Sequence, residues 1–379
     1  MEKIYFDYAS TTPCDLQVIR AMQPFFYENF GNASSPHSIG QEAQKALEDA
    51  RVALASFIGA KPQEIVFTSG STESNNHAIS GIVYNAMEYG DHIVVSSVEH
   101  HSVLEPVEQL KRDGFKVTFL PVDQYGLVDP LMVQESITDK TILVAVMHAN
   151  NEIGTIQPIS AISQITQAHR IPLLVDAVQT VGHIPVDVKA LGCDLLSLSA
   201  HKFYGPKGVG ALYIKEGTKV SPFLLGGDQE RSRRASTQNV AACVGMAEAI
   251  KLCGMNMESE AKRQMAWRNQ LLEEIPRKIP HVKINGHPQD RLPNNVHFSF
   301  DKVLGESLLM TLDMQGICAS MGSACTSGAM APSHVLKAIG LDDNWAMGSL
   351  RLSLGRFNTE ADIVKLLDAL PSMIETLRI

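Results

Sequence analysis

A lysine and an aspartate stand where two short apolar segments end, and this placement suits chemistry better than packing. Lys202 comes just after the apolar run of residues 194–199 and leads into the Gly/Pro-rich turn of residues 203–210. Asp176 ends a second apolar run, 26 positions before the lysine. Taken singly, they fit a surface lysine and a strand-end cap. Together they are the pair that pyridoxal phosphate requires, because a lysine amine binds its aldehyde and an acid at the pyridine nitrogen keeps the ring protonated.

Small polar residues at the start of a predicted helix offer a place for a phosphate group. Residues 64–68 are typical of a strand, and they lead into Ser69-Gly70-Ser71-Thr72 before the helix begins. A helix N-terminus presents free backbone N–H groups and the positive end of its dipole, and the two hydroxyls at 71 and 72 add donors. The alternative is an ordinary helix cap, which the same residue types favour.

Two more polar turns follow predicted strands. His100 comes shortly after strand 92–96, where an imidazole can stack on a cofactor ring, although such a histidine is often only a satisfied polar group. Asn151 follows strand 142–147, where its amide can bond a ring hydroxyl, although asparagine-rich turns also occur for backbone reasons. Both turns lie at the carboxyl end of a strand, which is where open α/β sheets bind their ligands.

Alternating strand and helix patterns indicate how these turns come together. Residues 38–58 carry apolar side chains at three- and four-residue steps, which predicts a helix. The elements expected after it are strand 64–68, helix 73–87, strand 92–96, helix 103–112, strand 115–120, helix 131–137, strand 142–147, helix 159–169, and strands 173–176, 195–199 and 209–214. The strands are short and apolar without alternation, so we expect parallel strands that helices cover on both faces.

The character of the sequence changes beyond Gly254, and this predicts a second, smaller α/β domain. The elements expected there are a polar helix at 258–274, strands at 282–284 and 295–300, a helix at 306–314, a strand at 350–354 and a final helix from Thr359. A chain of 379 residues is long for one core, which agrees with one large and one smaller domain.

The composition is that of a soluble globular enzyme, with 45% hydrophobic and 19% charged residues. A net charge of −9 argues against non-specific binding to nucleic acid or to an anionic membrane. The N-terminus carries acids and no long apolar stretch, and the most apolar run, residues 142–147, is too short to span a bilayer. We therefore expect a cytoplasmic protein that binds neither nucleic acid nor a membrane.

Six cysteines occur without a C-x-x-C pair, so neither a zinc site nor a dithiol motif is predicted. Without a secretion signal they are expected to be free thiols, with Cys193, Cys243 and Cys253 as small core residues. Cys325 differs, because small residues surround it and predict a loop that can carry a reactive thiol. The alternative is a free thiol without a role.

Several spaced motifs follow one another in a fixed order along the chain. They are Gly31-Asn-Ala-Ser-Ser35, the phosphate turn of residues 68–76, Ser199-Ala-His-Lys202, residues 226–230 with 234–237, the small-residue loop around Cys325, and Arg351-Leu-Ser-Leu-Gly-Arg356. Together they resemble the cysteine desulfurases of the NifS/IscS type, in the aminotransferase class V family of fold-type I pyridoxal-phosphate enzymes. The resemblance runs from residue 5 almost to the C-terminus.

The resemblance implies an α/β fold of the fold-type I pyridoxal-phosphate transferase class. Residues 15–254 would form a large cofactor-binding domain, with a mostly parallel central sheet flanked by helices. Residues 1–14 and 255–379 would form a smaller α/β domain, which carries the nucleophile loop at 320–332.

The resemblance also implies roles for particular residues. Lys202 would bind the cofactor and act as general base, His100 would shuttle a proton, and Cys325 would be the nucleophile. The residues implied to hold pyridoxal 5'-phosphate are Ser71, Thr72, His100, Asn151, Asp176, Gln179, Ser199, His201, Lys202 and Thr237. Asn32 and Arg351 would hold the substrate carboxylate, whose two oxygens match a guanidinium fork. Arg356 fits an interface or surface arginine at least as well.

The implied reaction removes sulfur from L-cysteine and leaves L-alanine and a persulfide on Cys325. A sulfur-acceptor protein would then receive the sulfur, for iron–sulfur cluster assembly or other thiolation. No resident metal is implied, although Cys325 would be placed to ligate a nascent iron–sulfur cluster transiently. Thr237 would reach the phosphate of a neighbouring subunit, which implies a homodimer.

Two departures from the family pattern bear on these roles. Ala235-Ser236 stands where the family has Ser-Gly, directly before Thr237. The chain also ends at Ile379, without the longer tail with which the IscS branch docks scaffold proteins. The competing functions are a selenocysteine lyase, a cysteine-sulfinate desulfinase or an aminotransferase of the same fold. A further alternative is a cofactor-stabilised partner protein that is not an enzyme.

Overall fold

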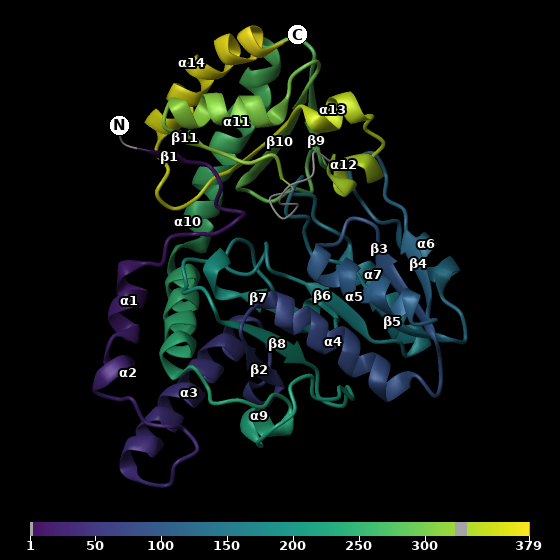
Figure 1. Cartoon of the computed structure of the whole chain (residues 1–379), viewed down its shortest axis with the longest axis vertical. Helices are drawn as coiled ribbons and strands as arrows, with labels where there is room; N and C mark the ends of the chain where they lie inside the picture. The colour runs from purple at the N-terminus through teal and green to yellow at the C-terminus, as the bar shows by residue number, and fades with distance from the viewer. Residues whose placement is uncertain (1–2, 323–331, 379) are drawn as a thin grey trace.

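A seven-stranded sheet forms the centre of the larger part of the protein (Figure 1). The structure is a computed structural model that describes residues 3–322 and 332–378. The strands, in spatial order, are β2 (Ile65–Thr68), β8 (Gly210–Ile214), β7 (Leu195–Ser199), β6 (Leu173–Asp176), β5 (Thr141–Ala145), β3 (His92–Ser96) and β4 (Lys116–Leu120). Every strand except β8 runs in the same direction, so the predicted mostly parallel sheet is confirmed.

Strand β8 is the exception to the expectation of parallel strands. It pairs antiparallel with both β2 and β7. A tight Gly/Pro-rich turn at residues 203–209 joins it to β7, and so short a link cannot carry a helical crossover. The same turn follows Lys202 and therefore keeps that residue at the carboxyl end of β7.

Alternate residues of the central strands point into two hydrophobic clusters, which explains why these strands are apolar throughout. One cluster packs the sheet against α3 (Ser38–Phe57), α6 (Pro130–Ser136), α7 (Ile159–His169) and part of α10 (Val240–Lys278). The other packs its opposite face against α4 (Ser71–Ala86) and α5 (His101–Arg112). Helices therefore cover both faces of the sheet, as expected for parallel strands.

A smaller part of the protein is built on a three-stranded antiparallel sheet in the order β12-β10-β9. Its strands are β9 (Val282–Asn285), β10 (Asn295–Phe300) and β12 (Ser349–Ser353), and its main helices are α11 (Gly305–Met314) and α14 (Glu360–Leu377). The N-terminal β1 (Ile4–Tyr5) joins this part through parallel pairing with β11 (Ile317–Cys318). These elements share one hydrophobic cluster that includes Phe6.

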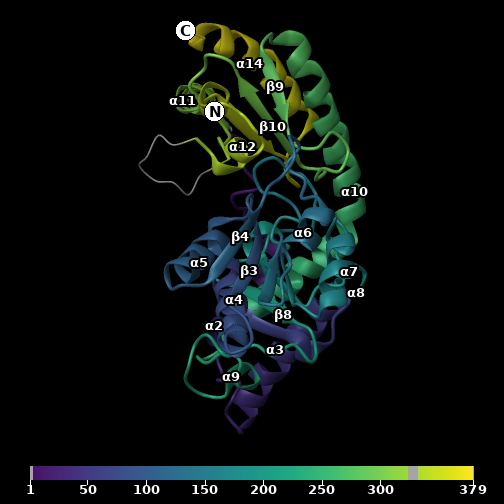
Figure 2. The same ribbon diagram turned by 90° about the vertical axis from the view of Figure 1, so that its right-hand side faces the viewer.

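Helix α10 links the two parts, and it corrects one expectation from the sequence. It runs unbroken over 39 residues, so the helix predicted at 258–274 is only its second half. Figure 2 shows it passing along one side of both parts. Gly254 lies inside it, and the predicted domain limit at 254 therefore falls within a helix. By length and composition α10 could cross a membrane, but 61% of its most apolar window is buried inside the protein, as in a core helix.

Short helices complete the described chain. They are α1 (Leu16–Met22), α2 (Pro24–Tyr27), α8 (Val188–Leu191), α9 (Gln229–Ser232), α12 (His334–Ala338) and α13 (Asp343–Met347), with 3₁₀ turns at Pro62–Glu64 and Ala200–Lys202. All five described cysteines are free thiols. Cys193, Cys243 and Cys253 are buried, as predicted, and burial raises the thiol pKa of Cys193 and Cys253 to about 12.

Candidate active site

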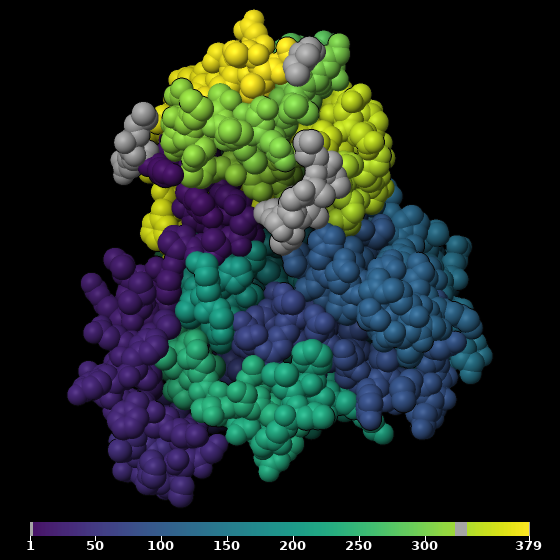
Figure 3. Space-filling view, viewed as in Figure 1, coloured from purple at the N-terminus to yellow at the C-terminus, as the bar shows by residue number. Residues whose placement is uncertain are grey.

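A cavity of about 360 Å³ lies where the carboxyl ends of the parallel strands meet the smaller part of the protein. Figure 3 shows the N-terminal segment, in purple, passing between the two parts. The predicted site residues that line the cavity are Ser71, Thr72, His100, Asn151, Asp176, Gln179, His201, Lys202 and Arg351. They come from the segments after five different strands and from β12, so the fold brings together residues up to 280 positions apart in the chain.

Lys202 ends the 3₁₀ turn that follows β7, and its amine contacts the N-terminal segment. Nζ donates to the carbonyl oxygen of Ala9 at 2.7 Å and to that of Ser10 at 2.8 Å. Gln179 Nε2 donates to the same Ala9 carbonyl at 3.0 Å. The two cavity residues are therefore held by one stretch of backbone.

The Asp176 carboxylate is buried at the end of β6, and each of its oxygens accepts a hydrogen bond. Asn75 Nδ2 donates to Oδ2 at 2.9 Å, and the backbone N–H of Val178 donates to Oδ1 at 3.0 Å. Asn75 lies on α4 and also reaches the Ser102 hydroxyl of α5 at 2.9 Å. Asn75 of α4, which α5 supports, and the backbone after β6 thus fix the plane of a carboxylate that faces the cavity.

The start of α4 provides the cavity with backbone donors. Ser71 and Thr72 are its first residues, and the preceding N-cap position is Gly70, which has no side chain to occupy them. A Cβ on Gly210 would lie 2.7 Å from Cα of Gly70, so β8 can approach this turn only with glycine at 210. His201 lines the same cavity, and burial together with Lys202 lowers its pKa to about 4.

His100 is the N-cap of α5 and has a defined tautomer. Its Nδ1 accepts the backbone N–H of Ser102 at 3.1 Å and lies 2.9 Å from the Ser102 hydroxyl. In the neutral ring the proton is therefore on Nε2. Burial lowers the pKa of His100, while the Asp176 carboxylate opposes that shift. The ring is thus neutral near pH 7 and carries one N–H.

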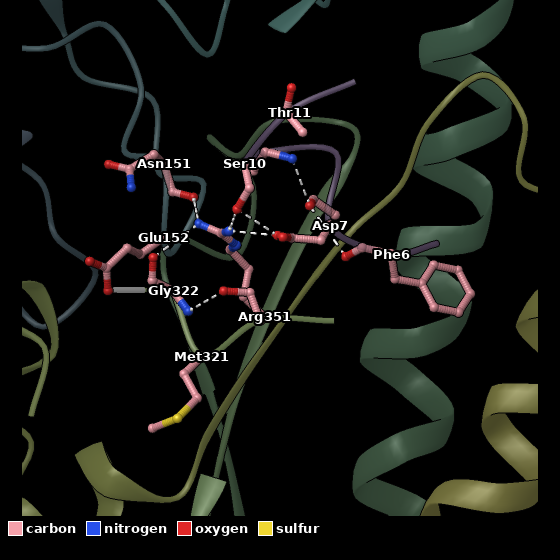
Figure 4. Close-up of polar contacts among 12 residues, drawn as sticks. Phe6, Asp7, Ser10, Thr11, Asn151, Glu152, Met321, Gly322 and Arg351 are labelled. Atoms are coloured by element: carbon pink, nitrogen blue, oxygen red, sulfur yellow. Dashed lines mark hydrogen bonds and ion pairs between the residues drawn. The ribbon is translucent and has the colours of Figure 1, made fainter. Parts of the chain in front are cut away.

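Arg351 lies in the middle of β12 and is 2% exposed. Figure 4 shows its guanidinium between Asn151 and the N-terminal segment. One terminal nitrogen donates to the Asn151 and Gly322 carbonyls at 3.0 and 3.2 Å, and the other to Asp7 Oδ1 and the Ser10 hydroxyl, both at 2.8 Å. Its Nε has no hydrogen-bond partner among the described residues.

Three described site residues, Asn32, Ser199 and Thr237, do not line the cavity of this chain. Asn32 and Thr237 are exposed, and Asn32 Oδ1 accepts the backbone N–H of Ser34 at 2.9 Å. Ser199 is buried at the end of β7, behind the turn that starts α4. Cys325 lies outside the described residues. Arg356 is likewise absent from the lining and instead pairs with Asp15 and Glu260 at 2.8 and 2.6 Å.

The cavity also contains residues that the sequence analysis did not single out. They are Ala9, Ser10, His101, Met147, Glu152, Val178, Gly322 and His334. Ala9 contributes its backbone carbonyl, so its residue type carried no signal. Glu152 follows Asn151 directly in the sequence. Its place beside a predicted site residue was the one signal from which it could have been predicted.

The chain matches the family model "Aminotransferase class-V" over residues 4–366. A cysteine desulfurase IscS of Dictyoglomus turgidum is 51% identical over 99% of this chain and 95% of its own length. A cysteine desulfurase IscS of Methanosarcina thermophila is 49% identical over 99% of this chain and 93% of its own length. The chain therefore belongs to the aminotransferase class V family.

Solved structures agree with this assignment. A NifS-like protein has a TM-score of 0.93 at 36% identity and covers 99% of this chain and 100% of its own. A structure described as SspA in complex with cysteine has a TM-score of 0.83 at 34% identity, covering 94% of this chain and all of its own. Within the family the chain groups with cysteine desulfurases of the NifS/IscS type, and the predicted fold-type I architecture is confirmed.

Proposed function

We propose that this protein is a pyridoxal-phosphate-dependent cysteine desulfurase. It would remove sulfur from L-cysteine and leave L-alanine and a persulfide on Cys325. The observation that carries the proposal is the convergence of nine predicted site residues on one cavity. A relative solved with cysteine supports the choice of substrate.

The donor set of the cavity fits pyridoxal phosphate. A buried carboxylate at Asp176 suits a protonated pyridine nitrogen, and the lysine amine suits an aldehyde. The first turn of α4 suits a phosphate, because its hydroxyls and N–H groups face the cavity and Gly70 cannot cap them. Ser199 and His201 would support the same end of the cofactor, and Asn151 and Gln179 its ring. When bound, the cofactor would supply an electron sink for the α-carbon of the substrate.

The residues of the chain would then orient the substrate and move its protons. Lys202 Nζ, which the Ala9 and Ser10 carbonyls hold at the cavity wall, would take the α-proton. His100 would stack on the ring and donate or accept a proton at Nε2. Arg351 would bind the substrate carboxylate with Asn32, through the terminal nitrogen that now contacts Asp7 and that the Ser10 hydroxyl can release by rotating.

We infer further that the protein acts as a cytoplasmic homodimer that passes sulfur to an acceptor protein. Aromatic residues on α2 and just after it are exposed: Phe26 and Phe30 by 67% each and Tyr27 by 83%. Apolar side chains of this kind favour an interface. Thr237, exposed in the single chain, would then reach the cofactor phosphate of the partner subunit. Residues 15–254 would form the cofactor domain, and residues 1–14 and 255–379 the smaller one.

Substitution of Cys325 by serine tests the function, because it separates cofactor chemistry from sulfur chemistry. Cys325→Ser should keep the visible absorbance of the cofactor-loaded protein, which depends on Lys202. Alanine release from cysteine should fall close to background, since a serine hydroxyl is a far weaker nucleophile than a thiolate. Mass spectrometry of the wild type after cysteine treatment should find added sulfur on Cys325. Normal alanine release by the serine variant would reject the desulfurase and favour a lyase or a transaminase.

A further inference from the structure

Glu152 is a buried carboxyl in the cavity wall to which the proposed chemistry gives no task. It is 2% exposed and follows Asn151 in the turn after β5. Its backbone is fixed on both sides, because its N–H donates to Asn150 Oδ1 at 2.9 Å and its carbonyl accepts from Asn295 Nδ2 at 3.1 Å. The carboxylate therefore projects from a rigid support into the junction of the two parts of the protein.

The carboxylate meets two residues of the smaller part. Ser333 Oγ donates to Glu152 Oε2 at 2.5 Å. Gly322 lies directly against the same oxygen, since a Cβ at 322 would come within 2.9 Å of it. Figure 4 shows the Glu152 carboxylate beside Gly322. Burial raises the pKa of the Glu152 carboxyl, and the Ser333 bond and the nearby Arg351 oppose that shift.

Each of these two residues is held by further bonds. The Gly322 carbonyl accepts from Arg351, and its N–H donates to Ser320 Oγ at 3.1 Å. The Ser333 hydroxyl accepts the N–H groups of residues 335 and 336, which start α12. His334 adds a second link across the junction, because its Nε2 lies 3.0 Å from the Glu99 carbonyl. Glu152 is therefore the common contact of two fixed points that flank Cys325 in the sequence.

We propose that Glu152 is a positioning residue for sulfur transfer. Its carboxylate accepts the Ser333 hydroxyl and packs against Gly322, and so sets the spacing of the two points between which the chain carries Cys325. The inference rests on the proposed function, because it takes Cys325 as the thiol that receives sulfur. Glu152 touches neither substrate nor cofactor in this role and acts through the residues that it holds.

The test is a double-mutant cycle on the full-length protein with its cofactor bound. Glu152→Gln and Ser333→Ala each remove the bond from one side, and the double variant removes both partners. The readout is the rate at which iodoacetamide alkylates Cys325, measured by mass spectrometry, which needs no turnover. We expect each single variant to change the alkylation rate by up to about tenfold, the ratio that corresponds to the loss of one buried hydrogen bond. The double variant should change it no further.

Matched control variants distinguish the loss of the Glu152–Ser333 contact from a general loss of stability. Glu64→Gln alters another buried glutamate, and Ser163→Ala removes another buried hydroxyl, both outside the cavity. Both should alkylate at the wild-type rate, and Ser333→Thr should restore it because it keeps the hydroxyl. In turnover, Glu152→Gln should lower kcat for alanine release with KM for cysteine nearly unchanged.

The outcomes distinguish this proposal from the proposed function. Wild-type alkylation rates in both single variants, or effects that multiply in the double variant, would overturn the role of Glu152. A wild-type protein that releases no alanine from cysteine would reject the desulfurase, while the alkylation cycle would still decide whether Glu152 fixes the two flanking points.

Discussion

Both carboxylate oxygens of Asp176 accept hydrogen bonds, and this determines the effect of the smallest substitution, Asp176→Asn. In Asp176→Asn the new amide would face donors from Asn75 and Val178. Asn75 can turn to present its Oδ1, which has no partner among the described residues, so the fold should survive. The lost charge should lower alanine production by about 100-fold or more, as for removal of one electrostatic contact in a site. Thermal unfolding and steady-state kinetics together check this. Activity within a few-fold of the wild type would show that another group pairs with the cofactor ring.

The two arginines of the last motif should behave differently when each is replaced by alanine. Arg351→Ala should weaken binding of both cysteine and alanine, by about 2–5 kcal/mol for a buried charged partner. Arg356→Ala should leave binding nearly unchanged and lower stability, because Arg356 pairs with Asp15 and Glu260 and stacks on Tyr204 at 4.2 Å. Titration by cofactor absorbance measures the affinities. The reverse pattern would show that the substrate carboxylate was assigned to the wrong arginine.

At the scale of elements, a buried ion pair ties α9 to α3 and β2. Arg51 donates to both carboxylate oxygens of Glu230 at 2.6 and 2.9 Å, and the Phe67 N–H donates to the same carboxylate at 2.9 Å. Both side chains are almost fully buried. Glu230→Ala would leave Arg51 with the partly exposed Glu48 carboxylate, 3.0 Å from Nε, as its remaining ion-pair partner. The free energy of unfolding should therefore fall by about 3 kcal/mol, the lower end of the range for a broken buried pair. The exposed pair Lys45–Asp49 serves as control, and its removal should cost about 0–1 kcal/mol in the same denaturant titration.

The elements that the sequence predicted well are those whose burial is uniform. Residues 142–147 were expected as a strand and β5 is Thr141–Ala145, because a strand covered on both faces is apolar at every position. Helix α10 was divided at Gly254 because its second half is polar, yet the helix continues where tertiary contacts outweigh the cost of one glycine. Strands β1 and β11 are two residues each and pair across more than 300 positions, so local patterns carry no signal for them.

The site residues divide in the same way, into those that local sequence patterns predict and those that they do not. Residues that act through side chains after strands, such as Lys202 and Asp176, were predicted and line the cavity. Ala9 acts through its backbone carbonyl, and any residue would supply the same oxygen. Asn32 and Thr237 remain predictions, because a single chain leaves both exposed and a second subunit would be needed to complete their contacts.

At the scale of the whole molecule, buried titratable groups should give stability a maximum near neutral pH. Burial lowers the pKa of His297 to about 3 and that of His148 to about 4, so only the unfolded chain binds these protons between about pH 4 and 6.5. Stability should therefore rise with pH across that window. Burial raises the pKa of Glu99 to about 8, so from about pH 4.5 to 8 only the folded state holds that proton, and stability should fall as pH rises.

The sum of these opposite slopes predicts a maximum near pH 6.5. The histidines, which include His201 with a pKa lowered to about 4, outweigh Glu99 below that value. Above it Glu99 acts in the same direction as Glu152, because burial raises the pKa of both carboxyls. Urea titrations at a series of pH values measure the profile. Glu99→Gln should flatten its alkaline side and steepen its rise between about pH 4.5 and 6.5, where Glu99 opposes the histidines. A profile that rises steadily from pH 6.5 to 8 would contradict the neutral, buried state of Glu99.

A homodimer should make cofactor retention depend on protein concentration. If Thr237 reaches the phosphate of the partner's cofactor, then dissociation into single chains removes a contact from both sites, and dimerisation stabilises binding by mass action. Phe26→Asp with Phe30→Asp would place charges among the exposed aromatic residues of α2 and the segment after it, where they should oppose an apolar interface. Sedimentation should show this variant dissociating at protein concentrations where the wild type is dimeric. Its cofactor absorbance should be lost on dilution in step with that dissociation. Val364→Asp, at another exposed apolar position on α14, is the control and should sediment as the wild type does. A monomer that keeps its cofactor and full activity on dilution would reject the shared site and leave Thr237 without a role.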